Sequence, residues 1–426
     1  MTYSRPLKAT LLARLAEPPR RIQILAGPRQ VGKTTLMRQI RSERHSDSMS
    51  YFAADESNRP MASLDFNANE AFAFSNQSEP LTGNWLRAKW ESAQLLAARW
   101  HDKNRDNQEA GSFVLVLDEI QKIPRWPDLV KGLWDQQATQ ASPMHVVLLG
   151  SSPLLMQKGL TESLAGRFEV IPMAHWSFEE MNDAFGFSLN DFVYFGGYPG
   201  SAPYIREESR WRDYIVRALI EPNVEKDILM MTRVDKPALL KQLFALGCAY
   251  SGQIVSLTKI KGQLNDAGNT TTLTGYLELL RQAGLMTGLY KHAANELRKR
   301  SSPPKFQVHN NALMSAMGTH SQQEAQTDRS HWGRLVESTV GAHLVNTATI
   351  GTQIHYWREG ATEVDFVIER GQSLAAIEVK SGNFKGQHQG LTEFIERHPH
   401  CRRWLVGGDE LPLGEFLRYP ASHWVE

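Results

Sequence analysis

GPRQVGKT, residues Gly27 to Thr34, follows the apolar run of residues 22–26 and decides the fold of the first part of the chain. A strand that runs into the pattern G-x-x-x-x-G-K-T and then into a helix is typical of a P-loop. In such a loop the backbone N–H groups face phosphates, the lysine neutralises their charge, and the threonine hydroxyl ligates Mg²⁺. The sequence therefore predicts a site for a nucleoside triphosphate and Mg²⁺. Its expected residues are Gly27, Pro28, Arg29, Gln30, Val31, Gly32, Lys33, Thr34 and Thr35.

A second apolar run, residues 113–117, ends in Asp118 and Glu119. Continuous apolar runs of this kind are typical of parallel strands buried on both faces. An acid at the strand tip can hold Mg²⁺, and the adjacent glutamate can polarise an attacking water. We therefore expect Asp118 to ligate the metal together with Thr34. Glu119 is the expected catalytic base, and Lys33 is expected to act on the phosphates.

Two later positions are candidates for completing this site. The strand of residues 145–149 is followed by Ser151 and Ser152. Ser151 or Ser152 is expected to sense the γ-phosphate, and the alternative is a helix cap. Arg167 directly precedes the strand of residues 169–172, where an arginine commonly projects into a neighbouring subunit's nucleotide. The alternatives for Arg167 are a structural salt bridge or a sensor within its own chain. A role in the neighbour would make the active unit a ring or at least a dimer.

Composition limits the classes of function. The chain has 426 residues, with 41% hydrophobic and 22% charged side chains and a net charge of +1, as in an ordinary protein of two to four domains. No global charge favours nucleic acid, so any such contact must come from local patches. The cysteines, Cys248 and Cys401, suit a reducing compartment. No apolar run has the length of a membrane span, and the first ten residues have no apolar signal core, so we expect a cytoplasmic protein without a membrane contact.

The order of elements expected for residues 236–300 is typical of a winged helix. Three helices are expected at residues 237–250, 257–264 and 270–284, and then a strand and a wing. The wing region is basic, through Lys291, His292, Arg298, Lys299, Arg300 and Lys305. Such a cluster can bind phosphates without reading sequence, and the third helix lacks the side chains that read bases. The segment therefore predicts non-specific DNA binding, with protein docking as the alternative.

The informative part of the C-terminal region is a hairpin of residues 363–369 and 374–380. Folding it about residues 370–373 pairs Asp365 with Glu378, and cross-strand partners lie close enough to share one metal ion. Lys380 lies on the same face, two residues further on. The opposite face is apolar and consists of Phe366, Ile368, Ala375, Ile377 and Val379.

This polar face resembles the D…E-x-K core of PD-(D/E)xK nucleases, with Glu337 in the helix position where many of them add an acid. The resemblance implies that Glu337, Asp365 and Glu378 hold Mg²⁺ and that Lys380 assists the attacking water, with Asp365, Glu378 and Lys380 catalytic. Where relatives tend to have an aspartate at the end of the preceding strand, this chain has His309 and Asn310. The alternatives are an ordinary amphipathic hairpin or a nuclease fold that has lost its activity.

The segments GPRQVGKTT, VLVLDEIQK, LLGSS, SLAGR and FGGYP together resemble a large prokaryotic AAA+ ATPase family. Its members pair the ATPase with a C-terminal domain that resembles restriction endonucleases. The resemblance implies an α/β fold and ATP with Mg²⁺ as cofactors. It also implies four parts, an AAA+ core (1–172), a helical lid (173–235), a winged helix (236–300) and a PD-(D/E)xK-like α/β domain (301–426).

Three functions follow from these features. The first is an ATP-dependent enzyme that acts on DNA and cleaves it with the C-terminal domain. The second is a nucleotide-gated motor that binds DNA but does not cut it, and the third is a sensor that docks a protein. The expected partners are DNA, bound through the winged helix and the C-terminal domain, and further copies of the chain, with a hexameric ring as one form.

Overall fold

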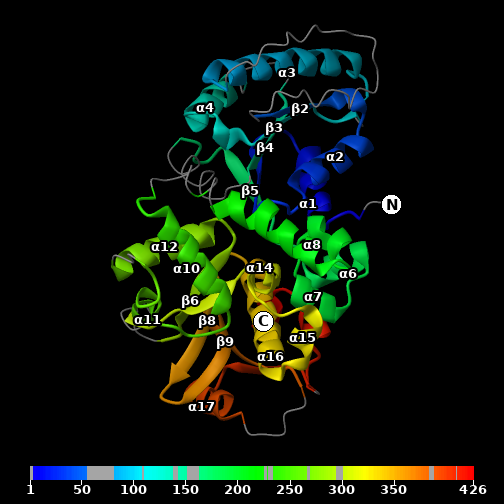
Figure 1. The fold of residues 1–426 in the computed structure, drawn as a ribbon. Helices are drawn as coiled ribbons and strands as arrows, with labels where there is room; N and C mark the ends of the chain where they lie inside the picture. The colour runs from blue at the N-terminus through cyan, green and yellow to red at the C-terminus, as the bar shows by residue number, and fades with distance from the viewer. Residues whose placement is uncertain are drawn as a thin grey trace. The chain divides into compact units, whose positions relative to one another are not determined.

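The computed structural model groups the described residues into two compact units (Figure 1). The N-terminal unit comprises Ser4–Gly27 and Gly32–Met173, and the C-terminal unit comprises Ala174–Glu426 with Met1–Tyr3 and Pro28–Val31. The structure describes residues 3–54, 81–107, 110–137, 143–150, 163–224, 228, 234–265, 269–293, 301–382, 388–408 and 410–426.

The N-terminal unit is a parallel sheet covered by helices. Its strands follow the order β2-β3-β4-β1-β5, and every neighbouring pair runs in parallel. The strands are β1 (Ile22–Ala26), β2 (Met49–Ala53), β3 (Val114–Asp118), β4 (His145–Gly150) and β5 (Phe168–Pro172). The helices are α1 (Leu7–Ala16), α2 (Lys33–Glu43), α3 (Gly83–Lys103) and α4 (Trp126–Gln137), with short 3₁₀ turns η1 (Ser46–Ser48) and η3 (Ile120–Lys122).

Burial on both faces explains why the central strands are apolar throughout. Alternate residues of β1, β3 and β4 pack in one cluster with α3 and α4, which contribute four buried tryptophans, Trp90, Trp100, Trp126 and Trp134. The intervening residues, such as Leu25 and Leu149, are also completely buried. The predicted strands at 22–26, 113–117, 145–149 and 169–172 are thus confirmed within one residue at their ends. The α/β P-loop architecture predicted for this part is the one observed.

The C-terminal unit combines helices with a mixed sheet of order β11-β10-β9-β8-β6-β7. Its strands are β6 (Met286–Lys291), β7 (Lys305–Val308), β8 (Thr352–Glu359), β9 (Thr362–Arg370), β10 (Ser373–Val379) and β11 (Arg402–Val406). Its helices are α6 (Phe178–Phe185), α7 (Leu189–Phe195), α8 (Glu208–Asp213), α10 (Pro237–Ala249), α11 (Leu257–Lys261), α12 (Thr270–Gln282), α14 (Asn311–Met317), α15 (Gln322–Thr327), α16 (Arg329–Thr347), α17 (Gln389–Arg397) and α18 (Leu413–Phe416). Three further helical segments are η4 (Pro199–Tyr204), the π-helical η5 (Tyr214–Ile220) and η7 (Ala421–Trp424).

The hairpin β9–β10 has the register that the sequence predicts. Glu369 pairs with Leu374 and Phe366 pairs with Ile377 in antiparallel fashion, and Asp365 and Glu378 are the residues that directly follow this last pair. The expected apolar face is buried, and it packs in the main core of the unit against α16. The opposite face is partly covered by α17, whose Leu391 and Phe394 pack with β9 and β10.

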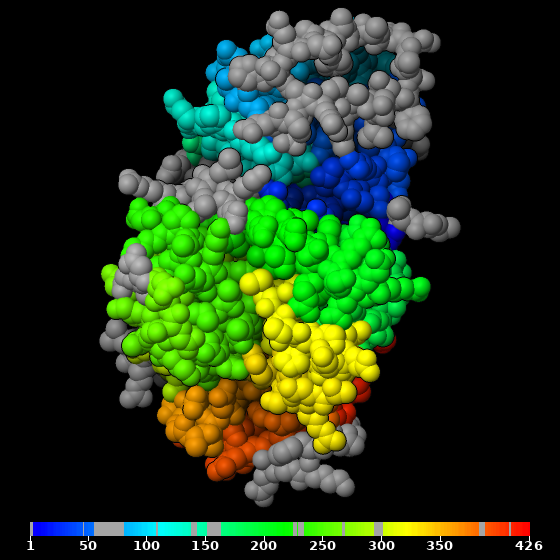
Figure 2. Space-filling view, in the orientation of Figure 1, coloured from blue at the N-terminus to red at the C-terminus, as the bar shows by residue number. Residues whose placement is uncertain are grey.

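The segments predicted as lid, winged helix and nuclease-like domain share one hydrophobic core. β6 pairs with β8 through Tyr290 and Lys291, so the sheet continues across the predicted boundary at residue 300. In the space-filling view the green surface of the helices before β6 adjoins the yellow surface of α14 to α16 (Figure 2). The three-helix-and-strand order of residues 237–291 is observed, while the winged-helix and nuclease-like folds stay predictions.

The glycines of the FGGYP segment allow a close approach of two chain segments. A Cβ on Gly196, which has φ +69°, would lie 2.0 Å from Oδ1 of Asn310. The N–H of Gly197 donates to the same oxygen at 3.0 Å. Asn310 also caps α14 by accepting from the N–H of Ala312. Asn310, whose role the sequence leaves open, is therefore a structural link within this unit.

Among the helices that the structure describes, none combines the length and apolar character needed to cross a bilayer. Cys248 and Cys401 are both free thiols, and Cys248 is buried. The cytoplasmic location stays a prediction.

Candidate nucleotide site and acidic cluster

The start of α2 brings Lys33 and Thr34 to the carboxyl end of β1. Gly32 is the N-cap of this helix and has φ +90°, a conformation that favours glycine. The ammonium of Lys33 is buried and donates to the carbonyl oxygen of Gly27 at 2.8 Å. A helix N-terminus beside a buried cation attracts an anion, because both the free N–H groups and the helix dipole favour negative charge.

Asp118, at the end of β3, is held by three donors. Thr34 Oγ1 donates to its Oδ2 at 3.0 Å, and the N–H of Glu119 donates to its Oδ1 at 2.8 Å. The hydroxyl of Tyr51 on β2 also donates to Oδ2. Burial and the charge of Asp118 raise the pKa of Tyr51 well above its usual value, so the phenol keeps its proton and remains a donor.

Sequence reasoning missed Tyr51. The register explains its position, because β2 pairs in parallel with β3 and Ala53 lies opposite Asp118. Tyr51 lies two residues earlier, on the same face of the strand as Ala53. A tyrosine on the strand beside the acidic strand end is the only sequence signal, and that signal depends on knowing which strands are neighbours.

Glu119 has a left-handed backbone, with φ +53° and ψ +35°. Such a conformation is uncommon for a residue with a side chain and is concentrated at functional sites. Its carboxylate Oε2 accepts from Nε2 of Gln121 at 2.6 Å. Gln121 therefore orients the group that is expected to act on water.

Arg167 forms a bidentate ion pair with Asp135 of α4. Its Nε lies 2.7 Å from Asp135 Oδ1 and its Nη2 lies 3.0 Å from Oδ2. The charge and hydrogen bonds of Asp135 raise the pKa of the arginine further, so it is always charged. This contact of Arg167 with Asp135 is the structural salt bridge that the sequence analysis kept as an alternative. The role of Arg167 in a neighbouring subunit stays a prediction.

The remaining predicted nucleotide residues are divided between the two units, and one of them is not described. Thr35 follows Thr34 on α2, and its side chain is exposed. Pro28, Arg29, Gln30 and Val31 group with the C-terminal unit, where the carbonyl of Val31 accepts from Nε1 of Trp176 at 3.0 Å. Gln30 has a left-handed backbone, with φ +64°. Ser151 lies outside the described residues.

The residues of the N-terminal unit fit ATP and Mg²⁺. Hard divalent cations prefer oxygen ligands, and the hydroxyl of Thr34 and the carboxylate of Asp118 present two oxygens 3.0 Å apart. Lys33 and the N-terminus of α2 fit the phosphates. This arrangement lies at the carboxyl ends of β1 and β3, where ligands bind in open α/β sheets.

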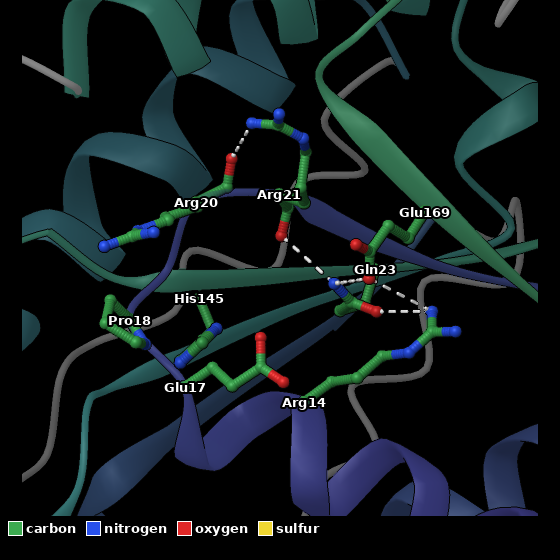
Figure 3. A pocket seen from close by; sticks show the side chains of 8 residues that line it. All are labelled: Arg14, Glu17, Pro18, Arg20, Arg21, Gln23, His145 and Glu169. Carbon is green, nitrogen blue, oxygen red and sulfur yellow. Dashed lines mark hydrogen bonds and ion pairs between the residues drawn. The ribbon is translucent and has the colours of Figure 1, made fainter.

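A cavity of about 170 Å³ lies elsewhere in the N-terminal unit, at the amino ends of β1, β4 and β5 (Figure 3). Three of its polar side chains contact one another: Arg14 contacts both Gln23 and Glu169, and Gln23 Nε2 donates to Glu169. His145 lines it with an Nε2 that has no hydrogen-bond partner among the described residues, and burial lowers its pKa to about 4. The cavity is at the wrong end of the sheet for the nucleotide and contains none of the predicted residues.

The acidic face of the C-terminal unit contains four carboxylates and two lysines. Lys380 Nζ lies 2.7 Å from Glu378 Oε1, and the N–H of Val379 donates to Asp365 Oδ2 at 2.8 Å. Lys305 Nζ lies 2.6 Å from Glu337 Oε1. Glu363 completes the group, at 3.8 Å from the same ammonium.

Burial raises the pKa of Glu378, and the charge of Asp365 adds to this effect while Lys380 opposes it. Burial also raises the pKa of Glu337, where Lys305 acts in the opposite direction. Within the described part of the chain, no group of three or more His, Cys, Asp or Glu residues is arranged to hold a metal ion. Ammonium groups already lie against Glu337 and Glu378, so the carboxylates of this face fit a divalent metal poorly.

Three of the six predicted wing residues, Lys305, Lys291 and His292, are engaged within the unit. Lys305 is completely buried, and Lys291 lies 2.8 Å from Glu359. The expectation that they contact phosphates on an exposed surface is therefore wrong for Lys305 and weakened for Lys291. His292 contacts the rings of His355, Phe394 and His398. Arg298, Lys299 and Arg300 lie outside the described residues.

Comparison with known families divides the chain into three matches. Residues 19–182 match the family model of an AAA domain. Residues 186–324 and 332–421 match two domains of unknown function, DUF8612 and DUF4143. The first match and the geometry at Lys33, Thr34 and Asp118 support a P-loop ATPase of the AAA+ class. The other matches leave the activity of the C-terminal unit open.

The curated relatives are themselves uncharacterised. A protein of Mycobacterium tuberculosis is 23% identical over 273 residues, which are 63% of this chain and 59% of the relative. A protein of Methanocaldococcus jannaschii is 25% identical over 197 residues, or 42% of this chain and 36% of the relative. The chain thus spans 59% of the length of the first of these relatives.

Solved structures with partial likeness include a Walker-type ATPase of Pyrococcus abyssi, at 16% identity and a TM-score of 0.48 over 74% of this chain and 95% of that one. DnaA of Aquifex aeolicus bound to AMPPCP matches at 13% identity and a TM-score of 0.28, over 65% and 86% of the two chains.

Proposed function

We propose that the N-terminal unit hydrolyses ATP with Mg²⁺. The observation that carries this proposal is the contact of Thr34 Oγ1 with Asp118 Oδ2 at 3.0 Å, next to the buried Lys33 at the N-terminus of α2. Thr34 and Asp118 would hold the metal, which neutralises charge on the phosphates when bound.

Each residue then has a distinct task. Lys33 and the N–H groups of α2 bind the phosphates and stabilise the charge that develops during transfer. Glu119 accepts the proton of the attacking water, and Gln121 fixes its carboxylate. Tyr51 keeps Asp118 in place by donating to the oxygen that also contacts Thr34.

The test is ATP turnover with and without Mg²⁺ in wild type and in Glu119→Gln. We expect turnover only with the metal, and retained ATP binding without turnover in the variant. Equal turnover in both proteins would refute the assignment of Glu119, and absence of turnover in wild type under all conditions would refute the proposed activity.

We further propose that DNA is the partner on which this ATPase acts, without sequence preference. What supports this is α11 and α12, which are capped by Ser256 and Asn269 and expose Lys259, Lys261 and several threonines. Cations on a surface bind phosphates through the release of counterions, so affinity should fall steeply with salt. The expected result is that Lys259→Glu with Lys261→Glu weakens binding of duplexes of unrelated sequence equally. If binding is unchanged, the partner is a protein or another surface binds DNA.

For the C-terminal unit we propose binding without cleavage, the second of the functions left open by the sequence. The lysine contacts of Glu337 and Glu378 support it. Assembly into a homo-oligomer, with a hexameric ring as one form, remains a separate proposal that rests on no contact of the described residues. Its test is the mass of the particle in solution with and without an ATP analogue.

A further inference from the structure

The side chain of Lys305 is completely buried at the acidic face of the C-terminal unit. Its Nζ lies 2.6 Å from Glu337 Oε1, 3.8 Å from Glu363 Oε1 and 3.8 Å from Asp365 Oδ1. The ammonium also donates to the backbone carbonyl of Asp365 at 3.0 Å. Carboxylates from α16 and β9 thus converge on a single positive charge supplied by the first residue of β7.

The surroundings keep this lysine charged. Burial alone would lower its pKa, but Glu337, Asp365 and Glu363 more than offset burial and raise the pKa above the ordinary value. The ring of Phe366, with its centroid 4.6 Å from Nζ, adds a cation–π contact. A fully desolvated ammonium persists only where such partners compensate its charge.

We propose that the ammonium of Lys305 occupies the cation position of this acidic face, so that the C-terminal unit holds a built-in cation in place of a divalent metal. The inference is independent of ATP hydrolysis in the N-terminal unit. It means that the face can organise the fold, but cannot carry out metal-dependent cleavage of a phosphodiester.

The contacts of the other carboxylate oxygens agree with this assignment. Asp365 Oδ2 accepts the N–H of Val379 at 2.8 Å, and Glu378 Oε1 lies 2.7 Å from Lys380 Nζ. Mg²⁺ binds oxygen at about 2.1 Å. A metal ion bridging Glu337 and Asp365 would therefore lie very close to the ammonium, at a distance where like charges repel strongly.

The proposal predicts that removing the ammonium creates a metal site. The experiment titrates MnCl₂ into the full chain by calorimetry. Every protein carries Asp118→Asn, so that the proposed ATP site contributes no Mn²⁺ binding. The protein with Lys305 should bind no Mn²⁺ that depends on Asp365. Lys305→Ala should gain one site, with affinity at least about tenfold above any background, and a second change, Asp365→Asn, should abolish it.

Lys305→Arg is the matched control, because it keeps the charge and should gain no site. If Lys305→Ala does not fold, the calorimetric titration of the protein that retains Lys305 tests the proposal by itself. Stoichiometric Mn²⁺ binding to that protein, lost in Asp365→Asn, would overturn the proposal. So would Mg²⁺- or Mn²⁺-dependent DNA cleavage by the full chain that Asp365→Asn abolishes.

Discussion

The two units treat the carboxylates of their candidate metal sites in opposite ways. In the N-terminal unit, the described donors to Asp118 are the neutral hydroxyls of Thr34 and Tyr51 and a backbone N–H. In the C-terminal unit, an ammonium group lies against Glu337. Neutral donors fix a carboxylate without cancelling its charge, so it can still attract a cation. An ammonium group offsets part of the negative charge and occupies the position beside the carboxylates where a metal ion would bind.

The comparison teaches that a pattern of acids and lysines does not by itself specify a metal site. Both units contain an acid at or near the end of a strand and a lysine nearby. What differs is where the lysine lies: Lys33 donates to a backbone carbonyl, whereas Lys305 lies among carboxylates. The position of the lysine ammonium group decides which carboxylates remain available to bind a metal ion.

The largest expected effect is on catalysis in the N-terminal unit. Glu119→Gln removes the proton acceptor but preserves the shape of the side chain, so ATP turnover should fall about 10²- to 10⁴-fold. ATP affinity should stay the same, because Glu119 is not expected to contact the nucleotide in the ground state. Turnover and equilibrium binding measure the two effects, with the exposed Glu91→Gln on α3 as the control.

The next effect is on the stability of the C-terminal unit. Lys305→Met leaves buried carboxylates without their cation, and the free energy of unfolding should fall by about 3–5 kcal/mol. Lys291→Met, which breaks a partly exposed pair with Glu359, should cost less than about 1 kcal/mol. Urea unfolding followed by tryptophan fluorescence compares them. Equal losses would mean that the Lys305 cluster is no more stabilising than a surface pair.

Acid should destabilise the C-terminal unit through its buried histidines. Burial lowers the pKa of His343 to about 4 and that of His309 to about 3. Since the unfolded state binds a proton at about pH 6.5, stability is complete above that pH and falls as the pH drops toward the folded-state values. These pKa shifts correspond to about 3 kcal/mol for His343 and about 5 kcal/mol for His309. Urea unfolding between these pH values, in wild type and in His343→Gln, checks the slope, which should be smaller in the variant.

A smaller effect is expected from Tyr51→Phe. The change removes one donor to Asp118 and should weaken the metal site by about 1.5–3 kcal/mol. The Mg²⁺ concentration for half-maximal turnover should therefore rise about tenfold or more, while the unfolding temperature changes little. Tyr290→Phe, at a tyrosine that is 49% exposed, is the control. An unchanged Mg²⁺ requirement would show that Thr34 and the backbone suffice to position Asp118.

The smallest effect concerns Arg167 and Asp135. Both side chains are partly exposed, so either alanine variant should change the stability of the fold little. Turnover should be alike in Arg167→Ala and Asp135→Ala. A loss of about 10³-fold in Arg167→Ala alone would instead establish a role for this arginine in a neighbouring subunit.

Local patterns were sufficient for much of the fold. The run of residues 113–117 predicts its strand because a strand buried on both faces must be apolar throughout. The hairpin register was predictable because the apolar face of β9 and β10 allows only one pairing. The contact of Thr34 with Asp118 follows from the meeting of strand ends in a parallel sheet.

Long-range placement was not predictable from these patterns. Lys305 lies near a basic stretch of sequence, and only its contact with acids 32 and 60 residues away, Glu337 and Asp365, removes it from the wing surface. Tyr51 reaches Asp118 because β2 pairs with β3, and Asn310 meets Gly197 because two segments more than 100 residues apart share a core. Spacing in the sequence does not encode such neighbours.

The most direct test of the central claim is the number of Mn²⁺ ions bound per wild-type chain in the presence of a non-hydrolysable ATP analogue, counted by electron paramagnetic resonance. The account predicts one ion, which is lost in Asp118→Asn and retained in Asp365→Asn. A second ion that disappears in Asp365→Asn would contradict it, because the acidic face would then hold a metal despite Lys305.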